Sequence, residues 1–267
     1  MRISVSGTIG IGKSTLISDF RTEWPNYNIP STDYRDLLKN GTYPHSKACN
    51  QEGQWAILNH MIDEMQKYSK DDNVIFDRCP LDNLVFSLWA MSKGNTDIDV
   101  EFIDKCIPIV RESIRLLDII FFIPMTKASP VPIVDNGRRE TDPEYIAEID
   151  NIFKSLQSQY HNNLDATPFF PKDDCAAIIE IFGKPQERIQ LLKMYLNADG
   201  GIIGDDASSI LNPENIRELE QLVLEQATEH QKEQYYAKQK KLVDEFQTNL
   251  DAAPKKRGSN YTPKKKK

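Results

Sequence analysis

The first fifteen residues contain the pattern that most constrains the fold of this chain. Residues 7–14 read Gly-Thr-Ile-Gly-Ile-Gly-Lys-Ser and match the phosphate-binding pattern G-x-x-x-x-G-K-[ST]. The pattern follows residues 2–6, which are typical of a short buried strand, and it opens a segment with helical spacing of apolar residues over 13–23. A strand, glycine-rich loop and helix in this order predict backbone N–H groups and a helix N-terminus that face a bound phosphate.

Each part of this phosphate-binding loop (P-loop, residues 7–14) has an expected role. The glycines let the backbone curl, Lys13 places a charge near the β- and γ-phosphates, and the Ser14 hydroxyl ligates Mg²⁺. We therefore expect ATP and Mg²⁺ as cofactors. The chain has no Asn-Lys-x-Asp guanine pattern, which disfavours a GTPase. The expected nucleotide contacts are Gly7, Thr8, Gly10, Gly12, Lys13, Ser14 and Thr15.

Strand and helix patterns alternate five times along the chain. This order predicts an α/β fold with a parallel five-stranded sheet that helices cover on both faces. Pro108 is expected to kink or split the helix that contains it. The expected strands are 2–6, 28–31, 73–77, 118–123 and 176–182, and the expected helices are 13–23, 48–68, 81–91, 98–116, 143–164 and 185–196.

The composition changes near residue 197. We expect a P-loop domain over 1–197, a helical extension over 198–254 and a basic disordered tail over 255–267. The tail carries seven Lys or Arg and no acidic residue, so the formal net charge of −7 leaves −14 for residues 1–254. The chain has no apolar run near the ~18 residues of a membrane helix and no signal peptide pattern. A cytoplasmic protein without a membrane partner is expected.

Charged residues follow the second and third expected strands, at the edge where open α/β sheets bind ligands. Asp77 is a candidate to hold Mg²⁺, together with Ser14, or to act as the base on the acceptor. Arg78 is a candidate to clamp a phosphate or the acceptor, and Asp33 is a second candidate base. The alternatives are an ion pair at the end of the third strand and an ordinary helix start near Asp33.

A proline-rich segment over 124–142 is expected to form a mobile loop. Arg138 and Arg139 lie in it, and a loop that closes over the nucleotide would bring their charge to the transferring phosphoryl group. An exposed basic pair is the alternative. Asp142 is expected to cap the helix that begins at Pro143.

Together these motifs resemble the P-loop nucleoside and nucleotide kinases, especially the branch with bacterial nicotinamide-riboside kinases and phage-encoded kinases. The resemblance covers about residues 1–197 and implies an ATP-dependent phosphotransferase. It also implies that Asp77, Arg78, Arg138 and Arg139 serve the phosphoryl-transfer site. The motifs that carry it are 7–15, 77–82, 138–145 with Asp150, and 182–188.

The acceptor is less constrained, because the chain lacks the spaced lid arginines and the Glu-x-x-x-Trp pattern of related kinases. Related phage enzymes phosphorylate 5-hydroxymethyluracil in DNA, and the basic tail suits a polymeric acceptor, so we favour DNA in a host cytoplasm. A DNA acceptor is opposed by the formal net charge of −14 on residues 1–254, because this charge would repel the phosphates of DNA. A free (deoxy)nucleoside or mononucleotide is the alternative. A P-loop ATPase that switches a partner and a nucleic-acid-binding module are the other classes.

Overall fold

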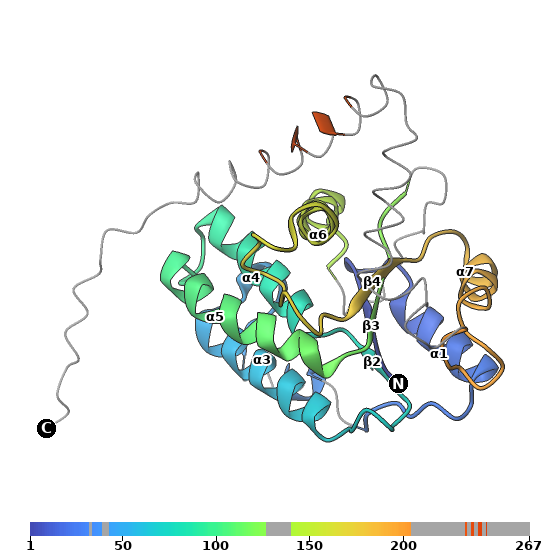
Figure 1. The fold of residues 1–267 in the computed structure, drawn as a ribbon. Coiled ribbons are helices and arrows are strands. Elements are labelled where there is room, and N and C mark those ends of the chain that lie inside the picture. Colours follow the sequence, from blue (N-terminus) through green and yellow to red (C-terminus); the bar gives the residue numbers. More distant parts are fainter. Residues whose placement is uncertain are drawn as a thin grey trace, which may run out of the picture.

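The computed structural model describes residues 1–31, 34–38, 43–126 and 140–203, together with residues 233, 236–237, 240–241 and 244. In this part of the chain a parallel sheet lies between two layers of helices, as Figure 1 shows. This confirms the expected α/β class with helices on both faces. The expected extension over 198–254 lies largely outside the described residues, and the tail over 255–267 lies wholly outside them.

The sheet contains four strands in the described residues: β1 (Arg2–Ser6), β2 (Val74–Asp77), β3 (Ile119–Phe122) and β4 (Ala177–Glu180). Their order is β2-β1-β3-β4, and all neighbours are parallel. The register pairs Ser4 with Phe76 and Ile120, and Ile120 with Ile178. The carboxyl ends of all strands therefore meet at one edge, at the top of the sheet in Figure 1.

The prediction of a fifth strand over 28–31 is wrong for the described residues. Only Asn28 pairs there, through a single parallel bridge to Val74. The Asn28 N–H donates to Asn73 O over 2.9 Å, and its carbonyl accepts from Ile75 N over 3.0 Å. Two residues later, Pro30 has no N–H to offer a strand ladder, so the pairing stops after one residue.

Two layers of helices cover the sheet. Helices α1 (Lys13–Glu23) and α7 (Pro185–Leu192) cover one face. Four helices cover the other face: α3 (Gln51–Gln66), α4 (Pro80–Lys93), α5 (Val100–Ser113) and α6 (Pro143–Asn163). Successive strand residues alternate between the two sides, because side chains in a strand have a period of two. Ile119 and Phe121 join the core under α1 and α7, whereas Ile120 and Phe122 join the core under α3–α6.

Short helical turns complete the described elements: α2 (Arg35–Leu38), η1 (Ser46–Ala48) and η2 (Ile114–Leu116). Pro108 does not split its helix, since α5 runs through Pro108 to Ser113, and the alternative of a kink there stays a prediction. The predicted cap of α6 is confirmed, because an Asp142 carboxylate oxygen accepts from Glu144 N over 2.9 Å. No helix among the described residues has the length and apolar character needed to cross a membrane.

Candidate active site

The P-loop lies between β1 and α1, and its backbone uses conformations that favour glycine. Gly7, Gly10 and Gly12 have φ values of 141°, 75° and 90°. A Cβ at Gly7 would lie 2.6 Å from the carbonyl oxygen of Ile123, so a side chain there would also collide with backbone. Gly12 is the N-cap of α1, and the helix therefore directs its N-terminus into the loop.

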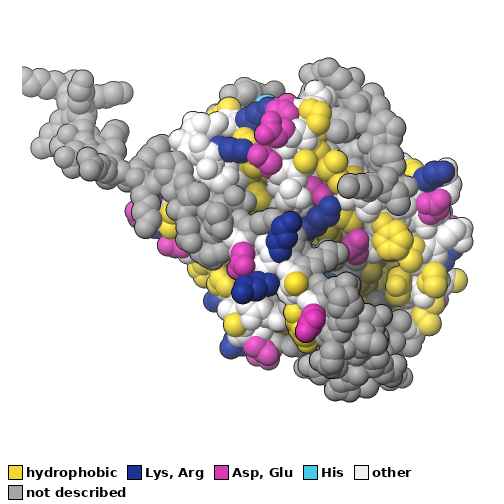
Figure 2. All heavy atoms as spheres, turned by 90° about the horizontal axis from the view of Figure 1, so that it is seen from above, with side chains coloured by type: hydrophobic (Ala, Val, Ile, Leu, Met, Phe, Trp, Pro, Cys, Tyr) yellow, Lys and Arg dark blue, Asp and Glu magenta, His cyan; other side chains and the backbone are white. Residues whose placement is uncertain are grey.

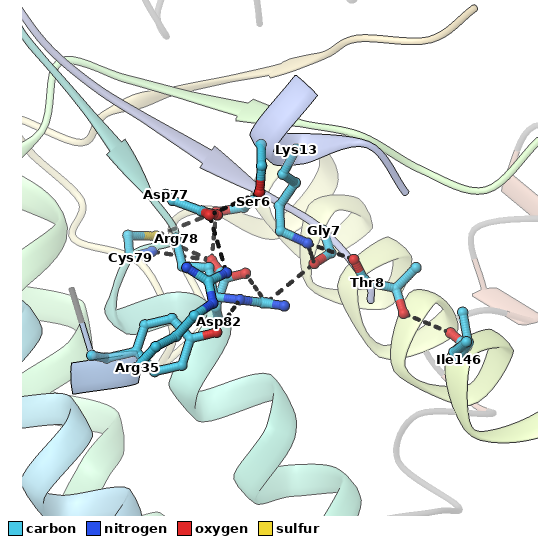
Figure 3. Close-up of polar contacts among 12 residues, drawn as sticks. Ser6, Gly7, Thr8, Lys13, Arg35, Asp77, Arg78, Cys79, Asp82 and Ile146 are labelled. Atoms are coloured by element: carbon cyan, nitrogen blue, oxygen red, sulfur yellow. Dashed lines mark hydrogen bonds and ion pairs between the residues drawn. The ribbon is translucent and has the colours of Figure 1, made fainter. Parts of the chain in front are cut away.

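Lys13 is buried inside this loop. Its Nζ donates to Gly7 O over 2.8 Å and to Thr8 O over 2.5 Å, as Figure 3 shows. Burial, with a further contribution from the Arg78 charge, holds the pKa of Lys13 well below its usual value. The loop is braced from outside, because the Thr8 hydroxyl donates to Ile146 O of α6 over 2.8 Å. A phosphate in the loop would supply the counter-charge that Lys13 lacks.

Asp77 ends β2 opposite the start of α1. Its Oδ2 accepts from Ser14 Oγ over 3.3 Å and from an Arg35 guanidinium nitrogen over 3.0 Å. Burial alone would raise the pKa of Asp77, but the charges of Arg35, Lys13 and Arg78 outweigh it and hold the pKa below its usual value. Asp77 is therefore an ionised carboxylate and a weak base.

The Ser14 and Asp77 oxygens also fit a Mg²⁺ ion. Asp77 Oδ1 is buried and has no hydrogen-bond partner among the described residues. Mg²⁺ prefers oxygen ligands and is commonly bound by one or two carboxylates together with substrate phosphates. A hydroxyl beside a carboxylate with one unpaired buried oxygen suits that ligand set.

Arg78 follows Asp77 in the chain, and several neighbouring groups contact its side chain. Its backbone is left-handed, with φ of 83°, and its guanidinium donates to Asp82 Oδ1 over 2.8 Å and to Gly7 O over 3.3 Å. The Tyr34 hydroxyl accepts from Arg78 Nε over 3.1 Å. The guanidinium also lies 4.9 Å from the ring centre of Phe86. This side chain therefore lies beside the P-loop in a fixed orientation (Figure 3).

The Asp82 carboxylate organises this part of the site. It is 1% exposed, and its Oδ2 accepts from Ser6 Oγ over 2.6 Å and from Cys79 N over 3.2 Å. The ion pair with Arg78 is thus fully buried and joins β1, the turn after β2 and the first turn of α4. Asp77 and Arg78 both form ion pairs, as the structural alternative expects, and Arg78 also lines the neighbouring cleft. A role of either residue in phosphoryl transfer stays a prediction.

A cleft of about 900 Å³ opens beside the P-loop and is lined by α2, η1, α3 and α4. Figure 2 looks onto this edge of the sheet and shows Lys and Arg side chains next to acidic ones near the centre of the face. Gln54 of α3 and Asn83 of α4 form part of the lining. Asn83 Nδ2 donates to Gln54 Oε1 over 2.6 Å and to Gln54 O over 3.0 Å. Asn83 Oδ1 is buried and has no partner among the described residues.

Three of the predicted site residues, Asp33, Arg138 and Arg139, lie outside the described residues. The structure brings Lys13, Ser14, Asp77 and Arg78 together, as the sequence predicts. The structure also places other residues beside these four, and no role was predicted for them from the sequence. Asp82 and Asn83 lie at the start of α4, a few residues after Asp77 and Arg78, and this short spacing offered a signal. Gln54 offered none. The added residues are Tyr34, Lys47, Gln54, Asp82, Asn83 and Arg188.

Solved structures share this fold at low sequence identity. Deoxyadenosine kinase from M. mycoides, solved with dCMP and dCDP, is 18% identical with a TM-score of 0.51, and the match covers 73% of this chain and 97% of that one. NadR protein in complex with NR is 16% identical with a TM-score of 0.50, and the match covers 76% of this chain and 53% of that one. The present chain thus spans about half the length of NadR. These likenesses show a P-loop kinase fold.

At the level of sequence, no curated protein matches this chain. A family profile described as an AAA domain matches residues 2–164. The matched range is more than half of the chain and includes the P-loop, Asp77, Arg78 and the cleft residues of α3 and α4. It ends at Leu164, directly after α6. The chain therefore belongs to the AAA domain family.

Proposed function

We propose that this protein is an ATP-dependent kinase that transfers the γ-phosphoryl group to a hydroxyl of a nucleotide-type acceptor. The observation that carries the proposal is the position of the P-loop at one cleft. Lys13, Ser14 and Arg78 line the cleft beside the loop, and the amide pair Gln54–Asn83 lines it from α3 and α4. A P-loop that only switched a partner would not need a cleft with buried, partly unpaired amide groups.

On the nucleotide side, Lys13 and the backbone N–H groups would stabilise the charge on the phosphates. Ser14 and Asp77 would hold Mg²⁺, which neutralises charge on the phosphates when bound. Arg78, fixed by Asp82, would place its guanidinium at the reacting phosphate or the acceptor hydroxyl. Asp77 would orient that hydroxyl or a metal-bound water, because its low pKa makes it a poor proton acceptor. Arg138 and Arg139 are proposed to add charge from the segment before α6.

On the acceptor side, Asn83 Oδ1 is a buried acceptor without a donor among the described residues, and its Nδ2 is committed to Gln54. Amide groups in this arrangement pair with the hydrogen-bonding edge of a base or carboxamide. A cleft of this volume suits one nucleoside or nucleotide. A base in DNA would have to leave its stack to enter it. A free nucleoside or mononucleotide is therefore favoured, and 5-hydroxymethyluracil in DNA stays the candidate that the resemblance suggests.

The decisive experiment offers γ-labelled ATP with a panel of acceptors to the full chain. The panel contains free nucleosides, mononucleotides, nicotinamide riboside, plain DNA and hydroxymethyluracil DNA. A labelled acceptor is the expected result and identifies the substrate. Steady release of labelled phosphate without any labelled acceptor indicates an ATPase instead. DNA binding that Lys13→Ala does not affect, with no nucleotide turnover, indicates a nucleic-acid-binding module.

We also predict that Asn83→Ala raises the KM for the acceptor about 10- to 100-fold and leaves the KM for ATP nearly unchanged. The reason is that the substitution leaves a polar group of the acceptor without a partner and removes the Asn83 donor from Gln54 Oε1, at a typical cost of about 1–3 kcal/mol. Steady-state kinetics with the acceptor found in the panel measure the effect. Ser92→Ala is the matched control, because Ser92 lies on the same helix and its hydroxyl donates only to Trp89 O among the described residues. An unchanged acceptor KM in Asn83→Ala would contradict the assignment.

A further inference from the structure

Arg188 is a buried arginine on α7, behind the P-loop. It is 2% exposed, and its guanidinium binds two backbone carbonyls. Arg188 Nη1 donates to Ile11 O over 2.9 Å, and Nε donates to Gly183 O over 2.8 Å. Among the described residues it has these backbone partners and no ion pair with a carboxylate, and burial lowers its pKa. A buried cation without an anionic partner carries a substantial desolvation cost, so its position beside an anion-binding loop requires a reason.

The contact with Ile11 places this charge at one particular peptide unit. Arg188 Nη1 also lies 3.0 Å from the position that a Cβ on Gly12 would occupy, so it is close to both residues of the Ile11–Gly12 peptide. A trans peptide is planar, and its C=O and N–H groups point in opposite directions. Because the guanidinium binds the carbonyl side, the Gly12 N–H points away from Arg188. In a phosphate-binding loop these N–H groups are the donors to the phosphate oxygens.

From this geometry we propose that Arg188 is a positioning residue for the nucleotide phosphates that never touches them. Its charge polarises the Ile11–Gly12 peptide, and this makes the Gly12 N–H a stronger donor to phosphate. The same charge adds positive potential behind the loop, because Arg188 itself is paired with no described carboxylate. The inference rests on the proposed binding of a nucleotide in the loop and concerns phosphate affinity alone.

A purely structural role would predict something different. Two carbonyls behind a loop need only two neutral donors, and a neutral side chain would fill the same space at a smaller desolvation cost. A tether between Gly183 and Ile11 would also hold the loop without discriminating between ligands. A charge effect, in contrast, depends on the charge of the ligand. Ligands with and without phosphate therefore separate the two roles.

The test compares Arg188→Gln, which keeps hydrogen-bond donors and loses the charge, with Arg188→Lys, which keeps the charge. Binding of ADP and of adenosine to the full chain is measured by competition against a fluorescent ADP analogue. We expect Arg188→Gln to weaken ADP binding about 10- to 100-fold, as for hydrogen bonds that involve a charged group. Adenosine binding should stay within about twofold by the same reasoning, and Arg188→Lys should keep ADP affinity within about fivefold. The KM for ATP should rise more than kcat falls.

Arg115→Gln is the matched control, because its guanidinium also donates to a backbone carbonyl, that of Asp173, on a more exposed part of the surface. Wild-type ADP affinity in Arg188→Gln would overturn the proposal, and so would an equal loss of ADP and adenosine binding. If Arg188→Gln does not fold, a loss above about tenfold in a folded Arg188→Lys is equally contrary to a charge effect. A wild-type chain that binds ADP but phosphorylates no acceptor refutes the kinase proposal and leaves this inference intact.

Discussion

Phosphoryl transfer from ATP is expected to fall at least ~10²–10³-fold in Lys13→Ala, the typical cost of removing one group that stabilises transition-state charge. Lys13 is the cation inside the P-loop, and its Nζ is held by Gly7 O and Thr8 O at the position where a phosphate would enter. The neighbouring cations Arg35 and Arg78 are each paired with a carboxylate, Asp77 and Asp82, and are therefore poorly placed to substitute for it. Single-turnover transfer to the acceptor identified in the panel measures the loss.

The same substitution should leave the empty protein folded. Burial depresses the pKa of Lys13 in the native state, so the unfolded chain binds a proton more readily at this residue. Stability of the wild type therefore rises with pH between the depressed native pKa and the usual lysine value, and Lys13→Ala lacks this increment. Thermal unfolding at several pH values tests this. Lys105→Ala, on an exposed helix turn beside Glu101, should change neither activity nor this dependence. Wild-type turnover in folded Lys13→Ala would remove the P-loop from the mechanism.

The elements set by local sequence were predicted closely. Helix α1 has the expected bounds, because a glycine-rich loop and a helical apolar stripe define its start and its buried face. Helix α6 begins at Pro143 behind the Asp142 cap, as two local signals require. The error at residues 28–31 has a local cause as well, because the proline at position 30 has no N–H and prevents the pairing from continuing.

Parts of the site that depend on contacts between distant residues were not predictable in the same way. Asp77 and Arg78 were found because the end of a parallel strand has a known place in the fold. Gln54 and Asn83 lie on different helices, and only the packing of α3 against α4 brings their amides together. Arg188 and Ile11 are 177 positions apart, and a sequence pattern gives no reason to join them. Side-chain pairs of this kind are set by tertiary packing.

Substitution of Arg78 is expected to lower the free energy of unfolding more than the other substitutions proposed above. Its ion pair with Asp82 is buried, with side-chain exposures of 7% and 1%. Arg78→Met would leave the Asp82 carboxylate buried with only Ser6 and Cys79 as donors, and breaking a buried pair in this way typically costs ~3–5 kcal/mol. Urea unfolding of the single variant should show this loss as a lower midpoint with an unchanged m-value.

The double variant Arg78→Met, Asp82→Asn separates stability from catalysis. It removes the stranded charge, and the amide oxygen introduced at position 82 can still accept from Ser6, so most of the lost stability should return. Phosphoryl transfer should not return with it, because no guanidinium then lies beside Gly7. A double variant no more stable than Arg78→Met would show that the Asp82 charge is not the source of the loss. Restored turnover in the double variant would instead show that Arg78 only holds the turn between β2 and α4. Lys13 and the P-loop backbone would then remain as the proposed phosphate-stabilising groups among the described residues.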